Sequence, residues 1–225
     1  DYAPCAFMDT YDPASVFSSI DAGGRYAYGN QPGIAQWNLA RLAEAMLPLF
    51  HPDADRAVER ATMALDRFPA LFEQHWLDGI RAKLGLFTPE DDDAALANDL
   101  LAWMHRRSAD FTNTFRLLTS GGLLQDTPNA DEDLEAWHRR LEARRGRQSQ
   151  SLAEATTLMR HHNPAFIPRN HNVEEALLAA TSRDDLSVME RLLDVLATPY
   201  DHARDLPKFS APQAADRAYR TFCGT

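Results

Sequence analysis

Few side chains in this sequence have types and spacing that suit a catalytic or metal site. The nearest approach to a metal-ligating group is His161, His162 and His171. Neighbouring side chains on a helix point about 100° apart, so His161 and His162 cannot easily share one tetrahedral ion. We therefore expect surface or loop histidines. Asp91 to Asp93 lack the alternating ligands of a calcium loop. Because they follow Pro89, they predict a solvated helix N-terminus, which favours acids.

The remaining candidates for chemistry are two thiols and one carboxylate. Neither Cys5 nor Cys223 has a neighbouring histidine that would activate it as a nucleophile. Asp1 is followed by the aromatic Tyr2 and the small Ala3, the order of the Asp-Phe-Gly segment in which kinases bind Mg²⁺. The simpler interpretation is a chain end at a strand exit. The sequence lacks the common phosphate-loop, dinucleotide, zinc-protease and hydrolase motifs.

Composition excludes several classes of partner. The chain has 225 residues, of which 44% are hydrophobic and 25% charged, and this is typical of a globular protein with a core. The net charge of −10 argues against nucleic acid as a partner. No apolar run approaches the roughly 20 residues that span a bilayer, so we expect no membrane partner. Two cysteines cannot form a disulfide scaffold or a four-thiolate zinc site.

The start of the sequence predicts a fragment and a location. The first residue is not methionine, and a proline already stands at position 4. We therefore expect that an N-terminal portion of the protein is missing. It has no basic segment followed by an apolar core, as a signal peptide would have. With no signal peptide or membrane span, we expect a cytoplasmic protein of bacterial type.

The pattern of apolar residues predicts a mainly α-helical domain in three parts. Prolines and glycines interrupt residues 1–33, which we expect to be irregular. Apolar residues then repeat at helical spacing through residues 34–197, and residues 198–225 form an extended tail. Asp53 is a predicted N-cap. Pro48 and Pro52 limit where the first helix can run, and its apolar face extends to Phe50. The charged stretch 131–145 predicts a surface helix, and Asn172 a cap for the helix that starts at Val173.

Several longer strings resemble the SelO (YdiU) family, in order and from one end of the sequence to the other. They are residues 1–4, 24–28, 30–32, 34–44, 110–115, 163–171 and 221–225. The resemblance implies the C-terminal part of a protein-kinase-like fold: a helical C-lobe, an irregular N-terminal segment with the metal-binding end and an activation-like segment, and an extended tail. It implies transfer of AMP from ATP to Ser, Thr or Tyr hydroxyls of target proteins, with UMP transfer from UTP as a further activity.

The resemblance also assigns roles to particular residues. Asp1 matches the family aspartate that binds Mg²⁺ or Mn²⁺ beside the nucleotide phosphates, and a carboxylate suits either ion. The proposed base and the phosphate-binding residues lie upstream, so no catalytic residue is expected in this sequence and the isolated chain is expected to be inactive. Ala3 departs from the family glycine, and a Cβ is unfavourable there if the backbone has positive φ.

The two cysteines gain a possible role from the same resemblance. Cys223 stands third from the end, where the family has selenocysteine or cysteine, and redox control is attributed to a bridge between that tail and the activation-like segment. Cys5 lies in that segment and is the other thiol, so the resemblance implies a Cys5–Cys223 bridge. The alternative is that Cys5 is a buried core residue, because cysteine packs like a small hydrophobe.

Two other functions remain open at this point. A noncatalytic, all-helical protein-interaction module would make Asp1 and the cysteines incidental. The helical C-lobe of an ordinary protein kinase is disfavoured, because no Ala-Pro-Glu segment follows Asp1 at the usual distance.

Overall fold

The periodic part of the sequence forms a series of α-helices in the computed structural model, which describes residues 7–127 and 130–213. The described residues contain no β-strand, and an isolated β-bridge joins Thr10 and Asp110. The prediction of a mainly helical chain is therefore confirmed. The helices are η1 (Tyr28–Asn30), α1 (Gln31–Phe50), α2 (Ala54–Leu65), α3 (Phe68–Lys83), α4 (Asp93–Arg107), α5 (Phe111–Ser120), α6 (Leu123–Asp126), α7 (Glu132–Arg145), α8 (Leu152–His162), α9 (Asn170–Arg183), α10 (Ser187–Leu196) and α11 (Pro207–Ser210).

Side-chain caps define where several helices begin. Asp53, Asp110 and Asp131 each accept a hydrogen bond from the backbone amide three residues further on, at the starts of α2, α5 and α7. Ser151 and Glu154 form a capping box at the start of α8. Such caps satisfy backbone donors that the first turn leaves without partners. The predicted cap at Asp53 is confirmed.

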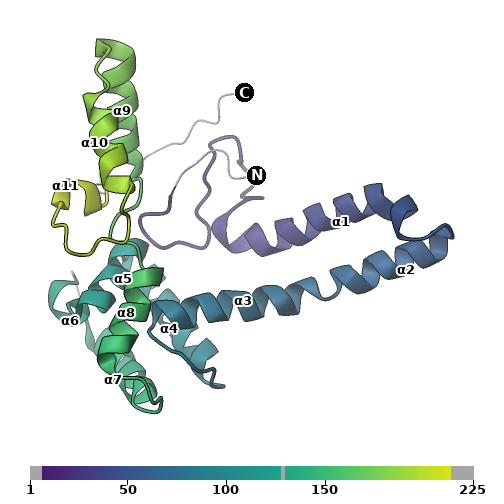
Figure 1. Ribbon diagram of the computed structural model, residues 1–225, viewed down its shortest axis with the longest axis horizontal. Helices are drawn as coiled ribbons and strands as arrows, with labels where there is room; N and C mark the ends of the chain where they lie inside the picture. Colours follow the sequence, from purple (N-terminus) through teal and green to yellow (C-terminus); the bar gives the residue numbers. More distant parts are fainter. Residues whose placement is uncertain (1–6, 128–129, 214–225) are drawn as a thin grey trace.

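Helices α1 to α3 form an arm that extends away from the other helices (Figure 1). In the arm, α1 packs along α2 and also contacts α3. In agreement with the limits predicted from Pro48 and Pro52, α1 ends at Phe50, between the two prolines. Pro48 lies in the last turn, where few helical residues follow the disturbance that a proline causes.

The remaining helices form a body around one main core. The core is built largely from α4 and its neighbours α3, α5 and α7, and it includes the buried side chains of Leu100, Met104 and Phe115. Trp137 of α7 is buried there and donates to the carbonyl oxygen of Leu96 at 2.8 Å. None of the helices in the described ranges is sufficiently long and apolar to span a membrane.

Helix α7 differs from its prediction as a surface helix. One side of it is buried, because Leu134, Trp137 and Leu141 follow one another at helical spacing and meet the core. Arg144 and Arg145 at its end are buried as well. The surface prediction relied on the high proportion of charged residues in 131–145 and did not take this apolar stripe into account.

Helices α9 and α10 form a hairpin that stands away from the arm (Figure 1). Helix α9 begins at Asn170, so the prediction that Asn172 caps a helix from Val173 is wrong, and Asn172 lies in the first turn. In the predicted irregular tail, α11 forms a short helix at Pro207–Ser210. A second small core joins Phe166 to Val195 of α10, and Phe209 packs against it.

Candidate functional site

The sequence-predicted site residues lie outside the described part of the chain. Asp1, Ala3 and Cys5 belong to residues 1–6, and Cys223 belongs to residues 214–225. The structure therefore does not test the metal-ligand prediction or the predicted bridge. It does describe how the chain is held directly after the first segment and directly before the last one.

The chain after Asp1 and Cys5 is held by an ion-pair cluster around a buried arginine. Arg169, at the start of α9, is 1% exposed and points its guanidinium at two carboxylates. Its Nη1 lies 2.6 Å from Asp9 Oδ1 and 2.7 Å from Asp110 Oδ2, and its Nη2 donates to Asp110 Oδ1 at 3.1 Å. Nη2 also donates to the Ser210 carbonyl oxygen at 2.8 Å. We call Asp9, Asp110, Arg169 and the Ser210 carbonyl the Arg169 cluster.

Backbone hydrogen bonds fix the same segment to the body. The Phe111 amide donates to the Asp9 carbonyl at 2.7 Å, and the Tyr11 amide donates to the Ala109 carbonyl at 2.9 Å. The Asn170 side chain donates to the Phe7 carbonyl oxygen at 3.1 Å. Residues 7–11 are therefore held by the start of α5 on one side and the start of α9 on the other.

The electrostatics of the cluster follow from burial and pairing. Burial raises the pKa of Asp110 above its ordinary value, although hydrogen bonds from Arg169 oppose this. Burial lowers the pKa of Arg169, but hydrogen bonds and charge attraction from Asp110 and Asp9 outweigh it and leave that pKa raised. Arg169 is thus a permanent cation. Because it faces two carboxylates, the cluster depends on its charge.

The tail approaches the cluster from the other end of the chain. The Ser210 carbonyl accepts from Arg169 and also from Asn113 Nδ2, at 3.0 Å. The Gln213 amide lies 3.4 Å from Asp9 Oδ2. The last described residues and the first described residues therefore meet at Asp9.

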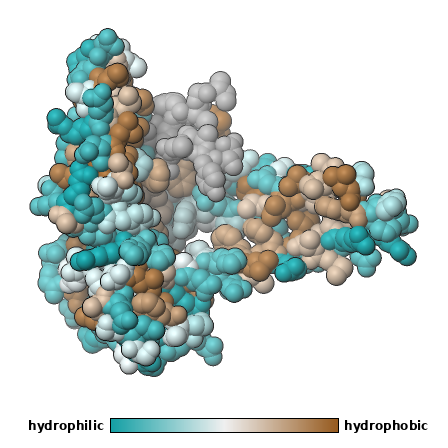
Figure 2. Space-filling model, viewed as in Figure 1, coloured by the Kyte–Doolittle hydropathy of each residue, from teal (hydrophilic) through white to brown (hydrophobic). Residues whose placement is uncertain are grey.

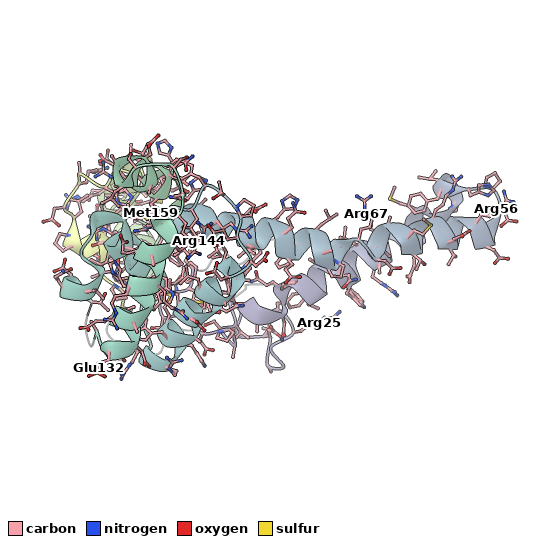
Figure 3. All side chains as sticks on the ribbon, turned by 90° about the horizontal axis from the view of Figure 1, so that it is seen from below. Arg25, Arg56, Arg67, Glu132, Arg144 and Met159 are labelled. Carbon is pink, nitrogen blue, oxygen red and sulfur yellow. The ribbon has the colours of Figure 1, made fainter. Side chains whose placement is uncertain are left out.

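The predicted solvated acids of residues 91–93 require a correction. Asp91 and Asp92 are exposed, but Asp93 is 1% exposed and pairs with Arg144, which is equally buried, at 2.7 Å. Arg81 Nε contacts the second oxygen of Asp93 at 2.7 Å. Figure 3 shows Arg144 within the body, whereas Arg56 and Arg67 lie along the arm. Residue 93 faces inward because it begins α4 on the side that packs against α7.

The three histidines considered as metal ligands lie on two different helices, α8 and α9. His161 and His162 are exposed at the end of α8, where His162 Nδ1 lies 2.9 Å from the Leu158 carbonyl. His171 lies in the first turn of α9, and its buried Nδ1 has no hydrogen-bond partner. Within residues 7–127 and 130–213, no three or more His, Cys, Asp or Glu side chains form a group that could hold a metal ion.

Burial lowers the pKa of Lys83, at the end of α3, to about 8. Its ammonium group donates to the His162 carbonyl at 2.7 Å and to Asn163 Oδ1 at 3.3 Å. The amide of Asn163 returns a hydrogen bond to the Lys83 carbonyl at 2.9 Å. These bonds join the end of α3 to the end of α8, and we interpret Lys83 as a structural residue.

Sequence reasoning missed the Arg169 cluster. Its three side chains are separated by many residues in the sequence, and no local spacing rule brings them together. One signal was available for Asp110, since an aspartate before a helix is a common N-cap. Arg169 belongs to residues 163–171, one of the strings that resemble the family, but the resemblance assigned it no role.

Comparisons with known proteins agree on one family. A family model described as "Protein adenylyltransferase SelO" matches residues 1–197. A protein nucleotidyltransferase YdiU from Halalkalibacterium halodurans is 53% identical over 228 residues, which cover 100% of this chain and 46% of that protein. Proteins of the same name from Anoxybacillus flavithermus and Syntrophotalea carbinolica are each 51% identical, again over 100% of this chain and 46% of their own length. The chain thus spans about half the length of these curated relatives.

Proposed function

Because this chain belongs to the SelO family of protein adenylyltransferases, we propose that it is the metal-binding and helical part of an enzyme that transfers AMP from ATP to protein hydroxyl groups. The observation that carries the proposal is 53% identity along the whole chain to a protein nucleotidyltransferase. The names of the family and of these relatives support nucleotidyl transfer as the general activity. The nucleotide, the metal and the acceptor residues are part of the proposal.

The proposed reaction is a displacement at the α-phosphorus of ATP. A Ser, Thr or Tyr hydroxyl oxygen of the target protein forms a bond to this phosphorus, and the bond to the bridging oxygen breaks. Pyrophosphate leaves with the electron pair of the broken bond, and the hydroxyl proton passes to a base. We propose that this base lies outside this sequence. UTP would react in the same way and transfer UMP.

Asp1 is the residue of this chain that we assign to the metal. A carboxylate is a ligand that Mg²⁺ and Mn²⁺ both accept, and either ion neutralises phosphate charge as the bond breaks. We further propose that the helical body is the C-lobe of a kinase-like fold.

The test uses the complete Halalkalibacterium relative with Mn²⁺ or Mg²⁺, a protein acceptor and ATP labelled on the α- or γ-phosphate. We expect label from the α-phosphate to stay on the acceptor and label from the γ-phosphate to leave with pyrophosphate. Replacing the aspartate matched to Asp1 with alanine should lower the rate about 100-fold or more, the effect of losing one charge-stabilising group. Retention of γ-label, or a variant with nearly normal rates, would contradict the proposal.

We also propose the Cys5–Cys223 bridge as a redox control of this activity. The contact between Gln213 and Asp9 supports it, since these two described residues, each close in sequence to one of the thiols, lie 3.4 Å apart. An extended chain covers about 3.4 Å per residue, enough for Cys223 to return to Cys5.

Thiol counting under denaturing conditions tests the bridge. We expect no free thiol after mild oxidation of this chain and two after reduction. The Cys5→Ser variant should keep Cys223 free under oxidising conditions in the monomer. Two free thiols in the oxidised, unsubstituted chain would refute the bridge.

A further inference from the structure

A small cavity lies where α11 meets the hairpin of α9 and α10. Its volume is about 110 Å³, room for about three or four water molecules, each of which takes roughly 30 Å³ in the liquid. Every residue that lines it belongs to one of these three helices, and the lining includes Asn172, Glu175, Val188, Arg191, Lys208 and Phe209. The cavity is therefore formed by the described helices alone and is separate from the arm.

The side chain of Asn172 leaves one polar atom of this lining unsatisfied. Asn172 is 3% exposed, and its Nδ2 donates to the Lys208 carbonyl oxygen at 3.2 Å. Its Oδ1 is buried and has no hydrogen-bond partner in the structure. Buried polar atoms are nearly always paired, because an unpaired one loses its bonds to water without replacement. An amide oxygen can only accept, so the partner that it lacks is an N–H or O–H group.

The charged side chains around the cavity favour a ligand with a single negative charge. Lys208 Nζ pairs with Glu175 Oε1 at 2.9 Å, so these two charges offset each other. The guanidinium of Arg191 forms no hydrogen bond or ion pair with another residue in the described ranges. The three side chains together therefore carry one net positive charge. A carboxylate matches this charge and the planar donors of arginine, whereas a phosphate dianion would exceed it.

The surroundings of the cavity favour a polar ligand over an apolar protein segment. Figure 2 shows hydrophobic residues gathered along the arm, whereas the side of the hairpin turned away from the arm is mostly hydrophilic in this view. Figure 1 shows α11 on that side of the hairpin, at its foot. The apolar part of the lining is small and comes from Val188, Leu192 and Phe209. A polar molecule with a short carbon skeleton suits these dimensions.

We propose that the cavity binds a small carboxylic acid that also carries a hydrogen-bond donor, the chemistry shared by amino acids and hydroxy acids. Its carboxylate pairs with Arg191, and its ammonium or hydroxyl group donates to Asn172 Oδ1. Its carbon atoms lie against Val188 and Phe209. The site is independent of the nucleotide and of the proposed transfer reaction.

Calorimetric titration of this chain with L-serine and with L-lactate tests the site. We expect at least one of them to bind with a dissociation constant of about 1 mM or lower, which is within reach of a ligand with so few heavy atoms. Serine alone would identify the donor as an ammonium group, and lactate alone would identify it as a hydroxyl group; both results support the proposal. Binding of neither would overturn it and leave the cavity to water.

Three further probes separate the two halves of the proposed ligand. Acetate has the carboxylate without the donor, and ethanolamine has the donors without the carboxylate. Each should bind at least about tenfold more weakly than the better of the two acids, the usual effect of one lost charge-assisted or buried hydrogen bond. Acetate that binds as tightly as that acid would overturn the role of Asn172. Inorganic phosphate that binds more tightly would overturn the ligand class.

Arg191→Met tests the position of the carboxylate. Arg191 is exposed and its guanidinium has no described partner, so the variant should fold as the unsubstituted chain does, which circular dichroism checks. We expect affinity to fall at least about tenfold, since the carboxylate loses its cation. Arg183→Met is the matched control, because Arg183 is an exposed arginine at the end of α9 that does not line the cavity. Equal affinities of the two variants would overturn the proposal.

Val188→Phe tests whether the ligand occupies the cavity itself. The larger side chain fills space that the ligand needs, so we expect no measurable binding. A thermal unfolding scan checks that the variant is folded. Unchanged affinity would place the ligand elsewhere and overturn the proposal. In the unsubstituted chain, the side-chain amide signals of Asn172 in a proton–nitrogen NMR spectrum should shift on titration, and signals that stay in place would contradict the contact with Oδ1. None of these readouts uses nucleotide or metal, so their failure leaves the proposed transfer reaction untouched.

Discussion

Replacing Arg169 with methionine is expected to lower the free energy of unfolding of this chain by roughly 3–5 kcal/mol, the cost of breaking a buried ion pair by removing one partner. Methionine fills much of the same space, so the loss comes from charge rather than from a cavity. Without the guanidinium, Asp9 and Asp110 would face each other with no cation between them. Urea unfolding followed by circular dichroism measures the change.

The structure also specifies where the Arg169 variant should loosen. The amides of Tyr11 and Phe111 join residues 9–11 to the start of α5, and they should lose protection from hydrogen exchange. Adding Asp9→Asn should recover part of the stability, because it removes one of the two uncompensated carboxylates. A double variant less stable than Arg169→Met alone would argue that charge repulsion is not the cause.

Arg106→Met is the matched control for this prediction. Arg106 pairs with Asp133 at 3.2 Å, but both side chains are exposed. Exposed pairs contribute about 0–1 kcal/mol, so this change should be within that range. If the two arginine variants had similar stabilities, the special role of the Arg169 cluster would be wrong.

The second large effect is expected from Asp93→Asn. The substitution leaves Arg144 and Arg81 without the carboxylate that both contact, and Arg144 is almost completely buried. We expect a loss of about 3 kcal/mol, at the lower end for a broken buried pair because Glu90 also lies 2.9 Å from Arg144. Urea unfolding at neutral pH measures it.

The same variant should respond differently to acid. Burial raises the pKa of Asp93, but hydrogen bonds, the largest from Arg144, outweigh burial and hold that pKa below its ordinary value. A lowered pKa in the folded state contributes stability above the unfolded pKa of about 4, and this stability is lost as the pH falls. The difference between the wild type and Asp93→Asn should therefore become smaller below about pH 4. A constant difference would exclude this carboxylate as the source.

The adjacent Asp92 gives a control that differs by one position. Its carboxylate lies 3.0 Å from Arg147 at the surface, and Asp92→Asn should change stability by about 0.5 kcal/mol or less. Equally small losses for Asp92→Asn and Asp93→Asn would contradict the stabilising role of the Asp93–Arg144 pair.

Local chemistry accounts for what could be predicted from the sequence. The spacing of apolar residues identified the helical region between residues 34 and 197, and Asp53 was identified as a cap from its type and position. These features depend on residues within one or two helical turns of each other. The family match also followed from short strings in the sequence and is confirmed by the comparisons.

Predictions that needed knowledge of distant neighbours were less successful. The acidic run at residues 91–93 contains one residue that faces Arg144, and composition cannot distinguish it from its exposed neighbours. Helix α7 is rich in charge, yet its apolar stripe packs on α4.

By itself, the sequence determined the helical class of this protein, several of its helix ends and its family, because each is encoded in short stretches of chain. Only the tertiary structure decided that Asp9, Asp110 and Arg169 meet and that Asp93 is buried. The physical reason is that burial and ion pairing depend on which helix faces come together. That pairing joins residues far apart in the sequence.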